Sequence, residues 1–346
     1  MKLYLENGYV NIPGILQRGL PFNFCVGGRG TGKTFTSLRY LKEVAKNTNR
    51  KFVFLRRTQT QVDLISKPEY SPFKAIDDLY GDYTLVKPIS KYTSAFYDGK
   101  AGENGMEAGQ LIGYIAALST ISNLRGFDAS DVDYILYDEF IQERHEKKIK
   151  DEYAALLNCY ETINRNRELS GKKPVQLLCL ANAFDLGNPI FTGLNLVRSV
   201  EKMRKTGQEQ LVLKDRGVAV YLLDKSSISS QKANTALYKL TKNSDFAQMA
   251  LKNDFAYDKA SKIKSIPLGE LTPVVAVGEV CVYQHKANNT LYVSAHKSGS
   301  PVTFSTSDSD LARFKHAFSW IWFEYLRNNI IFEDYMCELL LTKYFS

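Results

Sequence analysis

Metal-binding and disulfide-forming side chains are scarce in this sequence, and long hydrophobic runs are missing. Its 346 residues include five cysteines and four histidines, all isolated, and no two cysteines have the CxxC spacing of a zinc or redox site. The odd number of cysteines favours free thiols in a reducing compartment. No apolar stretch reaches the roughly 18 residues that a membrane helix needs, and the first residues lack the pattern of a secretion signal. We therefore expect a protein of a reducing compartment that has no membrane partner.

The overall composition is that of an ordinary globular protein, but positive charge is concentrated in one segment. Hydrophobic residues make up 44% of the chain and charged residues 24%, and the length is enough for two domains. The formal net charge is +8, and residues 198–264 hold 14 Lys and Arg against 7 Asp and Glu. Such a segment indicates either a polyanionic partner or a solvated basic face, and charge alone does not choose between them.

The first 200 residues alternate short apolar runs with amphipathic stretches, which is typical of a parallel sheet flanked by helices. Several runs are apolar throughout, as expected for strands covered on both faces. We expect helices over residues 32–47 and 147–168, from the spacing of their apolar residues, and a hairpin inserted at 83–109. The predicted strands cover residues 22–27, 51–57, 111–119, 132–140 and 175–183.

The pattern changes near residue 198, and the chain is expected to have three parts. Residues 1–197 form the α/β sheet domain. Residues 198–264, which are basic and weakly periodic, form a linker or a small helical subdomain. Residues 265–346 form a smaller α+β domain, in which residues 271–297 predict consecutive antiparallel strands and the rest predicts aromatic-rich helices.

The stretch from Gly27 to Thr34 matches GxxxxGK[ST], the phosphate-binding loop of P-loop ATPases, between a predicted strand and a predicted helix. Glycines let backbone amides wrap around a phosphate, and the helix N-terminus adds partial positive charge. Lys33 can reach the β- and γ-phosphates of ATP, and the Thr34 hydroxyl can bind Mg²⁺. The predicted nucleotide-binding residues of this loop include Gly27, Gly28, Gly30, Thr31, Gly32, Lys33 and Thr34.

An acidic pair ends the apolar run that begins at Val132. This run places Asp138 at the end of a buried strand, where it can hold Mg²⁺ through water, and Glu139 comes next. A carboxylate at that position can orient and deprotonate the attacking water. Such a pair can also cap the next turn, but together with the phosphate loop it predicts hydrolysis of ATP with Mg²⁺ as cofactor.

Polar residues at other strand and helix ends suit more than one role. Asn182 ends a predicted strand and either contacts the γ-phosphate or the water, or is an ordinary polar terminus. Arg56 and Arg57 end another strand, which puts them on the nucleotide-facing edge of a doubly wound sheet. Arg165 and Arg167 end a helix, where an arginine either acts on a neighbouring subunit's phosphoryl group or only offsets the helix dipole.

Five sequence motifs occur in the same order as in a known family: CVGGRGTGKT, KFVFLRR, YILYDEFI, AALLN with NRNRE, and CLANA. They cover about the first 200 residues. In these motifs the chain resembles the DNA encapsidation ATPases of phi29-like phages, packaging motors of the terminase and HerA/FtsK branch. The resemblance implies a P-loop NTPase fold of the additional-strand (ASCE) type. It also implies a C-terminal domain similar to a ribonuclease H without nuclease activity.

The resemblance further implies a homo-oligomeric ring, expected to have five subunits, which drives double-stranded DNA into a preformed capsid. The ring would dock on the capsid portal in the cytoplasm of the infected host, as some relatives do through a structural RNA. Arg165 then becomes the finger that acts on a neighbouring subunit, and Arg29 belongs to the nucleotide site, while the role of Arg125 stays open. A motor must slide over any sequence, so contacts to DNA phosphates are expected. The predicted DNA-binding residues are Lys202, Arg204, Lys205, Lys214 and Arg216.

Two other functions stay open at this point. A terminase-type packaging protein with an active C-terminal nuclease would need three or four convergent carboxylates. The first strand predicted in that domain, residues 274–284, offers only Glu279. The other alternative is a nucleotide-switched DNA-binding protein that hydrolyses ATP slowly and is not a motor.

Overall fold

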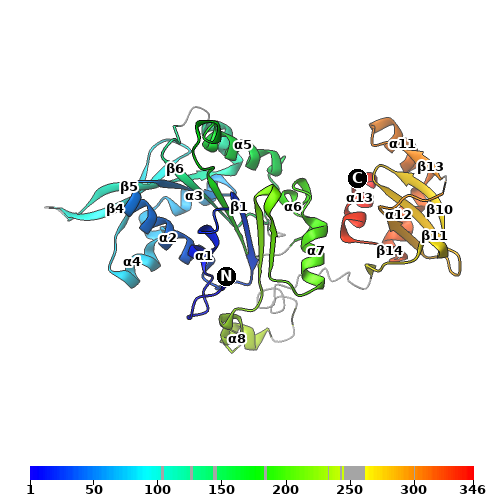
Figure 1. Cartoon of the computed structure of the whole chain (residues 1–346), viewed down its shortest axis with the longest axis horizontal. Helices are drawn as coiled ribbons and strands as arrows, with labels where there is room; N and C mark the ends of the chain where they lie inside the picture. The colour runs from blue at the N-terminus through cyan, green and yellow to red at the C-terminus, as the bar shows by residue number, and fades with distance from the viewer. Residues whose placement is uncertain are drawn as a thin grey trace. The chain divides into compact units, whose positions relative to one another are not determined.

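The chain folds into two compact units, each with its own sheet and core (Figure 1). The N-terminal unit holds Met1–Gly193 and Met203–Phe255, and the C-terminal unit holds Leu194–Lys202 and Ala256–Ser346. None of the described helices is long and apolar enough to cross a bilayer. This computed structural model describes residues 1–102, 105–124, 128–142, 146–182, 185–232, 234–241, 244, 262–299 and 301–346.

The N-terminal unit is built on a large, mostly parallel sheet. Among the described residues its strands are ordered β3-β4-β5-β2-β6-β7-β1-β9-β8. The strands from β5 to β9 in this order are parallel, and β4 and β8 join them in antiparallel pairs. β7 lies between β1 and β6 in the sheet. β7 is therefore the additional strand that the resemblance implies. The bounds are β1 Phe22–Gly27, β2 Lys51–Arg56, β3 Thr84–Pro88, β4 Ser94–Gly102, β5 Gly105–Ala117, β6 Val132–Asp138, β7 Gln176–Ala181, β8 Gln210–Leu213 and β9 Val218–Leu223.

Helices cover both faces of this sheet because successive strand residues point to opposite sides (Figure 1). On one face Leu38 of α2 shares a core with Phe52 of β2. On the other face Cys159 of α5 lies beside Val53, the next residue of β2, around a cavity of about 10 Å³. The helices of this unit include α1 Ile12–Leu16, α2 Lys33–Thr48, α3 Gln59–Ile65, α4 Lys74–Tyr80, α5 Glu152–Asn164, α6 Pro189–Gly193, α8 Ser227–Lys232 and α9 Ala236–Leu240.

The strongest patterns of the sequence are confirmed. The five predicted strands of the sheet domain, its two predicted helices and the inserted hairpin are all present, with ends that differ by a few residues. The hairpin is longer than expected, because β5 extends the predicted strand backwards to Gly105 and pairs with β4 along most of its length.

The predicted linker at 198–264 is wrong in its middle part. β8 and β9 lie within it and complete the edge of the large sheet beside β1. All six residues of β9, Val218–Leu223, are buried, and this apolar run is itself a signal for a covered strand. The basic residues on either side of this run made the whole segment read as a linker. These charged residues belong to solvent-facing turns and not to the strand. α7 Val197–Lys205 spans the boundary that divides the two units.

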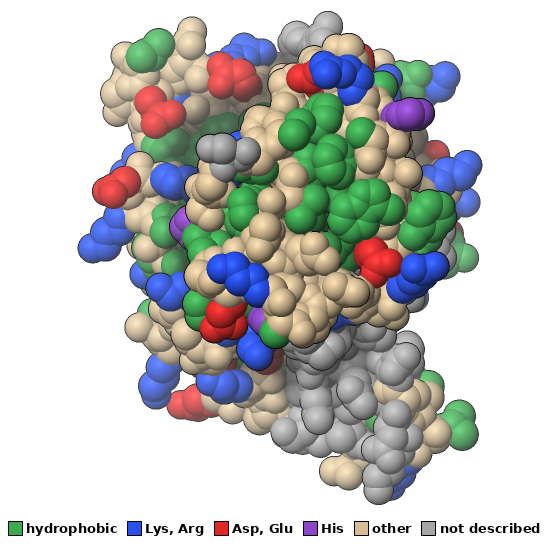
Figure 2. Space-filling model, turned by 90° about the vertical axis from the view of Figure 1, so that its right-hand side faces the viewer, with side chains coloured by type: hydrophobic (Ala, Val, Ile, Leu, Met, Phe, Trp, Pro, Cys, Tyr) green, Lys and Arg blue, Asp and Glu red, His purple; other side chains and the backbone are tan. Residues whose placement is uncertain are grey.

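The C-terminal unit packs helices on one face of a second sheet, ordered β13-β10-β11-β12-β14. Phe314, Ile321 and Leu341 bring three helices into one core with valines of β10 and β11. Figure 2 shows hydrophobic side chains gathered on the side of this unit where Figure 1 places β10 and β11. The bounds are β10 Leu271–Val277, β11 Val280–His285, β12 Leu291–Ser294, β13 Val302–Phe304, β14 Ile330–Phe332, α11 Asp308–Ala317, α12 Ser319–Leu326 and α13 Tyr335–Phe345.

Two details of this unit differ from the prediction. The closing segment is not wholly helical, because β14 lies within it and pairs in parallel with β12. A strand of three residues is too short to show a period of its own. Residues 274–284 are not one strand either, since Gly278 and Glu279 turn the chain between β10 and β11.

Candidate functional site

The segment between β1 and α2 forms a tight loop at the carboxyl edge of the large sheet. Gly30 and Gly32 have φ values of +82° and +75°, in the left-handed region that favours glycine. The ring of Tyr9 covers Gly32 so closely that a Cβ there would lie 2.5 Å from it. α2 begins at Lys33 directly after the loop, so the first amides of the helix face whatever anion the loop holds.

Lys33 is buried inside this loop. Its Nζ donates hydrogen bonds to the carbonyl oxygens of Gly27 and Gly28, at 2.8 and 2.9 Å, and to Thr31 Oγ1 at 3.3 Å. Burial lowers the pKa of Lys33 to about 8, and the Asp138 carboxyl acts in the opposite direction. Neutral acceptors of this kind can be exchanged for phosphate oxygens, which form stronger, charge-assisted bonds. The loop therefore fits the tail of a nucleoside triphosphate.

Four side chains meet next to the loop. Thr34 Oγ1 lies 3.1 Å from Asp138 Oδ1, although the two residues come from α2 and β6. Arg56 of β2 bridges both acids, donating to Asp138 Oδ2 at 2.8 Å and to Glu139 Oε2 at 2.5 Å. Burial raises the pKa of Asp138, and Arg56 and Thr34 oppose that rise. A hydroxyl and a carboxylate at this separation fit a shared Mg²⁺ ion, which takes oxygen ligands.

The backbone at the acidic pair is unusual. Glu139 has a φ of +57°, which non-glycine residues rarely adopt and which tends to occur at functional sites. The next amide, that of Phe140, donates to Leu180 of β7 at 3.0 Å, so the turn is fixed to the neighbouring strand. Asn182 comes directly after the end of β7 and is half-buried. Because β7 pairs with both β1 and β6, Asn182 lies at the edge between the loop and the acidic pair.

The side chain of Arg57 does not join that of Arg56 at the acidic pair. Its side chain is fully buried and pairs with Glu152, at the start of α5, and with the carbonyl of Phe140. Tyr137 donates to the same carboxylate at 2.8 Å. Burial raises the pKa of Glu152, and Arg57 opposes that rise. Arg57 thus lies at the carboxyl edge of the sheet, as predicted, but its side chain fixes α5 to the end of β6 and does not bond to the acidic pair.

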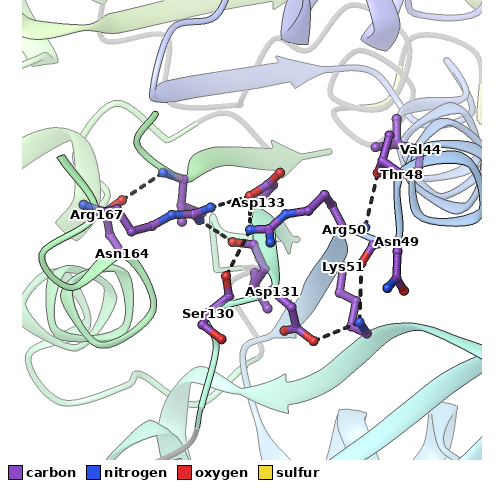
Figure 3. A network of polar contacts seen from close by, with 12 residues as sticks. Val44, Thr48, Asn49, Arg50, Lys51, Ser130, Asp131, Asp133, Asn164 and Arg167 are labelled. Atoms are coloured by element: carbon purple, nitrogen blue, oxygen red, sulfur yellow. Dashed lines mark hydrogen bonds and ion pairs between the residues drawn. The ribbon is translucent and has the colours of Figure 1, made fainter. Parts of the chain in front are cut away.

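The two arginines after α5 have different surroundings. Arg167 donates to Asp133 at 2.5 Å and to the carbonyl of Val132, and Arg50 pairs with the same Asp133 at 2.6 Å (Figure 3). Although burial acts to raise it, the pKa of Asp133 is lowered by hydrogen bonds from these two arginines. Arg167 is therefore a structural residue at the amino end of β6. Arg165 is exposed and has a φ of +46°.

Arg165 also lies at the amino end of the strands and away from its own phosphate loop. Asp133, next to this helix end, and Asp138, next to the loop, are five residues apart on β6. At about 3.3 Å per residue they are roughly 17 Å apart. Arg165 thus lies away from the predicted nucleotide-site residues of its own chain. Arg125 lies outside the described residues.

The five predicted DNA-binding residues are all exposed, and they lie on two separate elements. Lys202, Arg204 and Lys205 lie on α7, which precedes β8. Lys214 and Arg216 lie in the turn between β8 and β9, at the other end of β8. β9 begins at the amino edge of the sheet, so this turn lies on the same edge as Arg165.

Two neighbouring carboxylates of the C-terminal unit are engaged in structural contacts. Within the described residues, one group has the proximity of a metal site, and it consists of Glu333, Asp334 and Cys337. Glu333 accepts from Ser294 Oγ at 2.7 Å, and Asp334 caps α13 through the amide of Cys337 at 2.9 Å. Burial raises the pKa of the Cys337 thiol to about 12, which disfavours the thiolate that binds metals. Glu279 stands apart, in the turn beside Tyr344.

Two residues at the loop were not predicted from the sequence. Tyr9 covers Gly32, and Lys232 of α8 donates from its Nζ to the carbonyl of Arg29 at 3.0 Å. Neither residue lies in a motif. The buried run of β9 was the available signal for Lys232, because a strand parallel to β1 returns the chain to the same edge of the sheet.

Comparison with known proteins agrees with this geometry. A family model described as Podovirus DNA encapsidation protein (Gp16) matches residues 6–297, which is most of the chain. The chain belongs to this family.

The relatives of this Gp16-family chain are phage packaging proteins. The DNA packaging protein of Bacillus phage phi29 is 27% identical over 237 residues, 68% of this chain and 62% of that protein. The chain thus spans less than two thirds of the curated relative that it matches. The counterpart from Bacillus phage B103 is 27% identical over 238 residues, covering 68% of this chain and 64% of that protein.

Solved structures support the fold. The chain is similar to a protein of the bacteriophage Phi-29 viral genome packaging motor assembly, with a TM-score of 0.69, 20% identity and all of both chains covered. It is also similar to the Phi-28 gp11 DNA packaging motor, with a TM-score of 0.62 and 21% identity, over 98% of this chain and 97% of that one. At these identities the likeness shows the fold of both units.

Proposed function

We propose that the chain is an ATPase that acts as a subunit of a ring and drives double-stranded DNA into a preformed capsid. The observation that carries the proposal is the meeting of Lys33, Thr34, Asp138 and Glu139 at one edge of the sheet. Membership of the Gp16 family and similarity to packaging proteins support the coupling to DNA.

In the proposed reaction, Lys33 and the loop amides hold the phosphates of ATP, and Glu139 orients and deprotonates the attacking water. Thr34 and Asp138 would hold Mg²⁺, which neutralises charge on the phosphates when it is bound. Asn182, beside the acidic pair, is proposed to contact the water or the γ-phosphate.

In this mechanism the site has two states, one with Glu139 paired to Arg56 and one with Glu139 turned to the water. While Glu139 is paired with Arg56 at 2.5 Å, its carboxylate is held in that ion pair. Hydrolysis then requires Glu139 to leave Arg56 and turn to the water. Arg56 keeps its second bond to Asp138, so the arginine itself does not need to move far.

In this proposal, Arg165 of a neighbouring subunit supplies the positive charge that completes the ATP site. It is exposed and lies roughly 17 Å of strand length away from its own acidic pair, so it suits a partner's site and not its own. An arginine in this position stabilises the charge that develops on the transferred phosphoryl group. Lys214 and Arg216 are proposed to contact DNA phosphates, with Lys202, Arg204 and Lys205 as a separate basic group.

The substitution Glu139→Gln tests the assignment of the base. We expect nucleotide affinity within about threefold of wild type and an ATPase rate reduced about a hundredfold or more, because a general base contributes that much. A fluorescent ATP analogue measures binding, and phosphate release measures turnover. Glu161→Gln, an exposed carboxylate of α5, is the matched control and should retain wild-type turnover. A Glu139→Gln variant that turns over at a near wild-type rate would show that another residue is the base.

Coupling to DNA is tested separately, because a nucleotide-switched DNA-binding protein would share the same ATPase site. A motor is expected to hydrolyse ATP faster when double-stranded DNA of any sequence is added. A switch protein would bind DNA in a salt-dependent manner but show no DNA-stimulated turnover. Plasmid nicking with Mn²⁺ tests the nuclease alternative, for which the structural contacts of Glu333 and Asp334 predict no cleavage.

A further inference from the structure

A second strand of the large sheet, β9, leads the chain to the same edge as the phosphate loop. β9 is parallel to β1, and Leu223 at its end is in register with Gly27. The segment after β9 must therefore emerge beside the loop after β1, at the carboxyl edge where α/β proteins bind their ligands. This segment leads into α8, which ends at Lys232.

α8 is attached to the same framework as the loop. Ser226, just before the helix, is buried and donates to the carbonyl of Gly8 at 2.8 Å. The same N-terminal segment is bonded to the loop, since Val10 N donates to the carbonyl of Thr31 at 3.0 Å. The start of α8 is thus held in a fixed place beside the loop.

Lys232 reaches from α8 onto the outside of the loop. Its Nζ donates to the carbonyl of Arg29 at 3.0 Å and lies 2.0 Å from where a Cβ of residue 30 would be. A Cβ at position 30 would displace this ammonium group from its present place. Lys33 approaches the same loop from inside, bonded to the carbonyls of Gly27 and Gly28. The ammonium groups of Lys33 and Lys232 therefore both donate hydrogen bonds to backbone carbonyls of this one short loop.

We propose that Lys232 is a second phosphate-binding lysine, which exchanges the Arg29 carbonyl for an oxygen of the bound triphosphate. The exchange is favourable because a phosphate oxygen adds the attraction of an opposite charge to the hydrogen bond of the ammonium group, which a neutral carbonyl does not. An ammonium group also rotates freely on a flexible stem, so a small movement is sufficient. The inference rests on the proposed nucleotide site and adds a residue that lies outside the recognised motifs. Nucleotide occupancy would then fix the end of α8.

Binding measurements with two probes test this role. The probes are ATP and tripolyphosphate, each with Mg²⁺, and the variants are Lys232→Gln, Lys232→Arg and Lys239→Gln. Lys239 is an exposed lysine of α9 and serves as the matched control. We expect Lys232→Gln to weaken both probes about tenfold, because a hydrogen bond to a charged group is lost. Lys232→Arg should recover most of the affinity, and Lys239→Gln should not change it.

Thermal unfolding of the ligand-free chain separates phosphate binding from a purely structural effect on the loop. If Lys232 only braces the loop through Arg29, the Lys232→Gln variant will lower the Tm of the ligand-free chain as well as its affinity for both probes, and the proposal is wrong. It is also wrong if that variant binds tripolyphosphate as tightly as wild type does. Thermal unfolding should give the same Tm for Lys232→Gln and wild type, because the side chain is only half-buried. If the wild-type chain binds neither ATP nor tripolyphosphate, the proposed nucleotide site fails along with it.

Discussion

At the scale of single residues, the site depends on charges held in a buried place. Lys33 is buried among carbonyl oxygens, and Asp138 is buried between Arg56 and Thr34. Each of these charges costs free energy unless a partner offsets it. Asp138 has a charged partner in Arg56, whereas Lys33 donates to neutral oxygens. The proposed ligands, a triphosphate and a divalent cation, would add opposite charge beside Lys33 and Asp138.

The pKa of Lys33, lowered by burial to about 8, makes anion binding depend on pH. Below this pH the amine is protonated and ready to donate to a phosphate. Above it the amine is neutral in the free protein, so binding must take up a proton. We expect affinity for ATP to be constant between about pH 6.5 and 7.5 and to fall about tenfold by pH 9.

Fluorescence anisotropy of a labelled ATP analogue measures this dependence. The matched control is Lys33→Arg, whose guanidinium stays protonated throughout the range. The affinity that this variant retains should not change with pH. A wild-type affinity that is unchanged up to pH 9 would mean that Lys33 is protonated there and that burial does not set its pKa.

At the scale of elements, α5 connects the two edges of the sheet. Its first turn is fixed by the buried pair of Glu152 and Arg57, and its last turn leads into Arg167 and the carboxylate of Asp133. Arg165, two residues before Arg167, is exposed to solvent. The sequence presents two similar arginines, and the structure separates a half-buried one that pairs with Asp133 from an exposed one.

Alanine substitutions of the two arginines should therefore differ. Arg167→Ala removes a half-buried ion pair and should cost about 1–3 kcal/mol, which lowers Tm by several degrees. Arg165→Ala removes an exposed side chain and should change stability by less than about 0.5 kcal/mol. Thermal unfolding measures both. A larger loss of stability in Arg165→Ala than in Arg167→Ala would reverse the assignment.

Elements with a clear run or spacing of apolar residues, or with a motif, were predictable from the sequence. Contacts that depend on which strands pair in the sheet were not. The apolar runs of β1 and β6 and the loop between Gly27 and Thr34 can be recognised from local sequence. β9 was equally apolar, but basic neighbours obscured it, and the three residues of β14 are too few for a pattern. The contact of Lys232 with the loop depends on β9 pairing with β1, which local sequence does not encode.

At the scale of the whole molecule, the proposed ring requires that a site be completed by its neighbour. Arg165→Ala subunits have an intact loop and acids, and Glu139→Gln subunits have an intact Arg165. Each variant alone should be nearly inactive. Mixed rings should regain a measurable fraction of the wild-type ATPase rate, because one kind of subunit completes the other's site. A mixture as inactive as its separate components would show that Arg165 does not act between subunits.

Every proposed role depends on a triphosphate that lies against the amides of Gly30 to Thr34, with Asp138 and Glu139 on its far side. A crystal structure with a non-hydrolysable ATP analogue and Mg²⁺ is the decisive test. We predict phosphates inside the loop, the metal between Thr34 and Asp138, and Glu139 released from Arg56. A nucleotide found elsewhere on the chain, with Lys33 still bonded to Gly27 and Gly28, would contradict the proposed site.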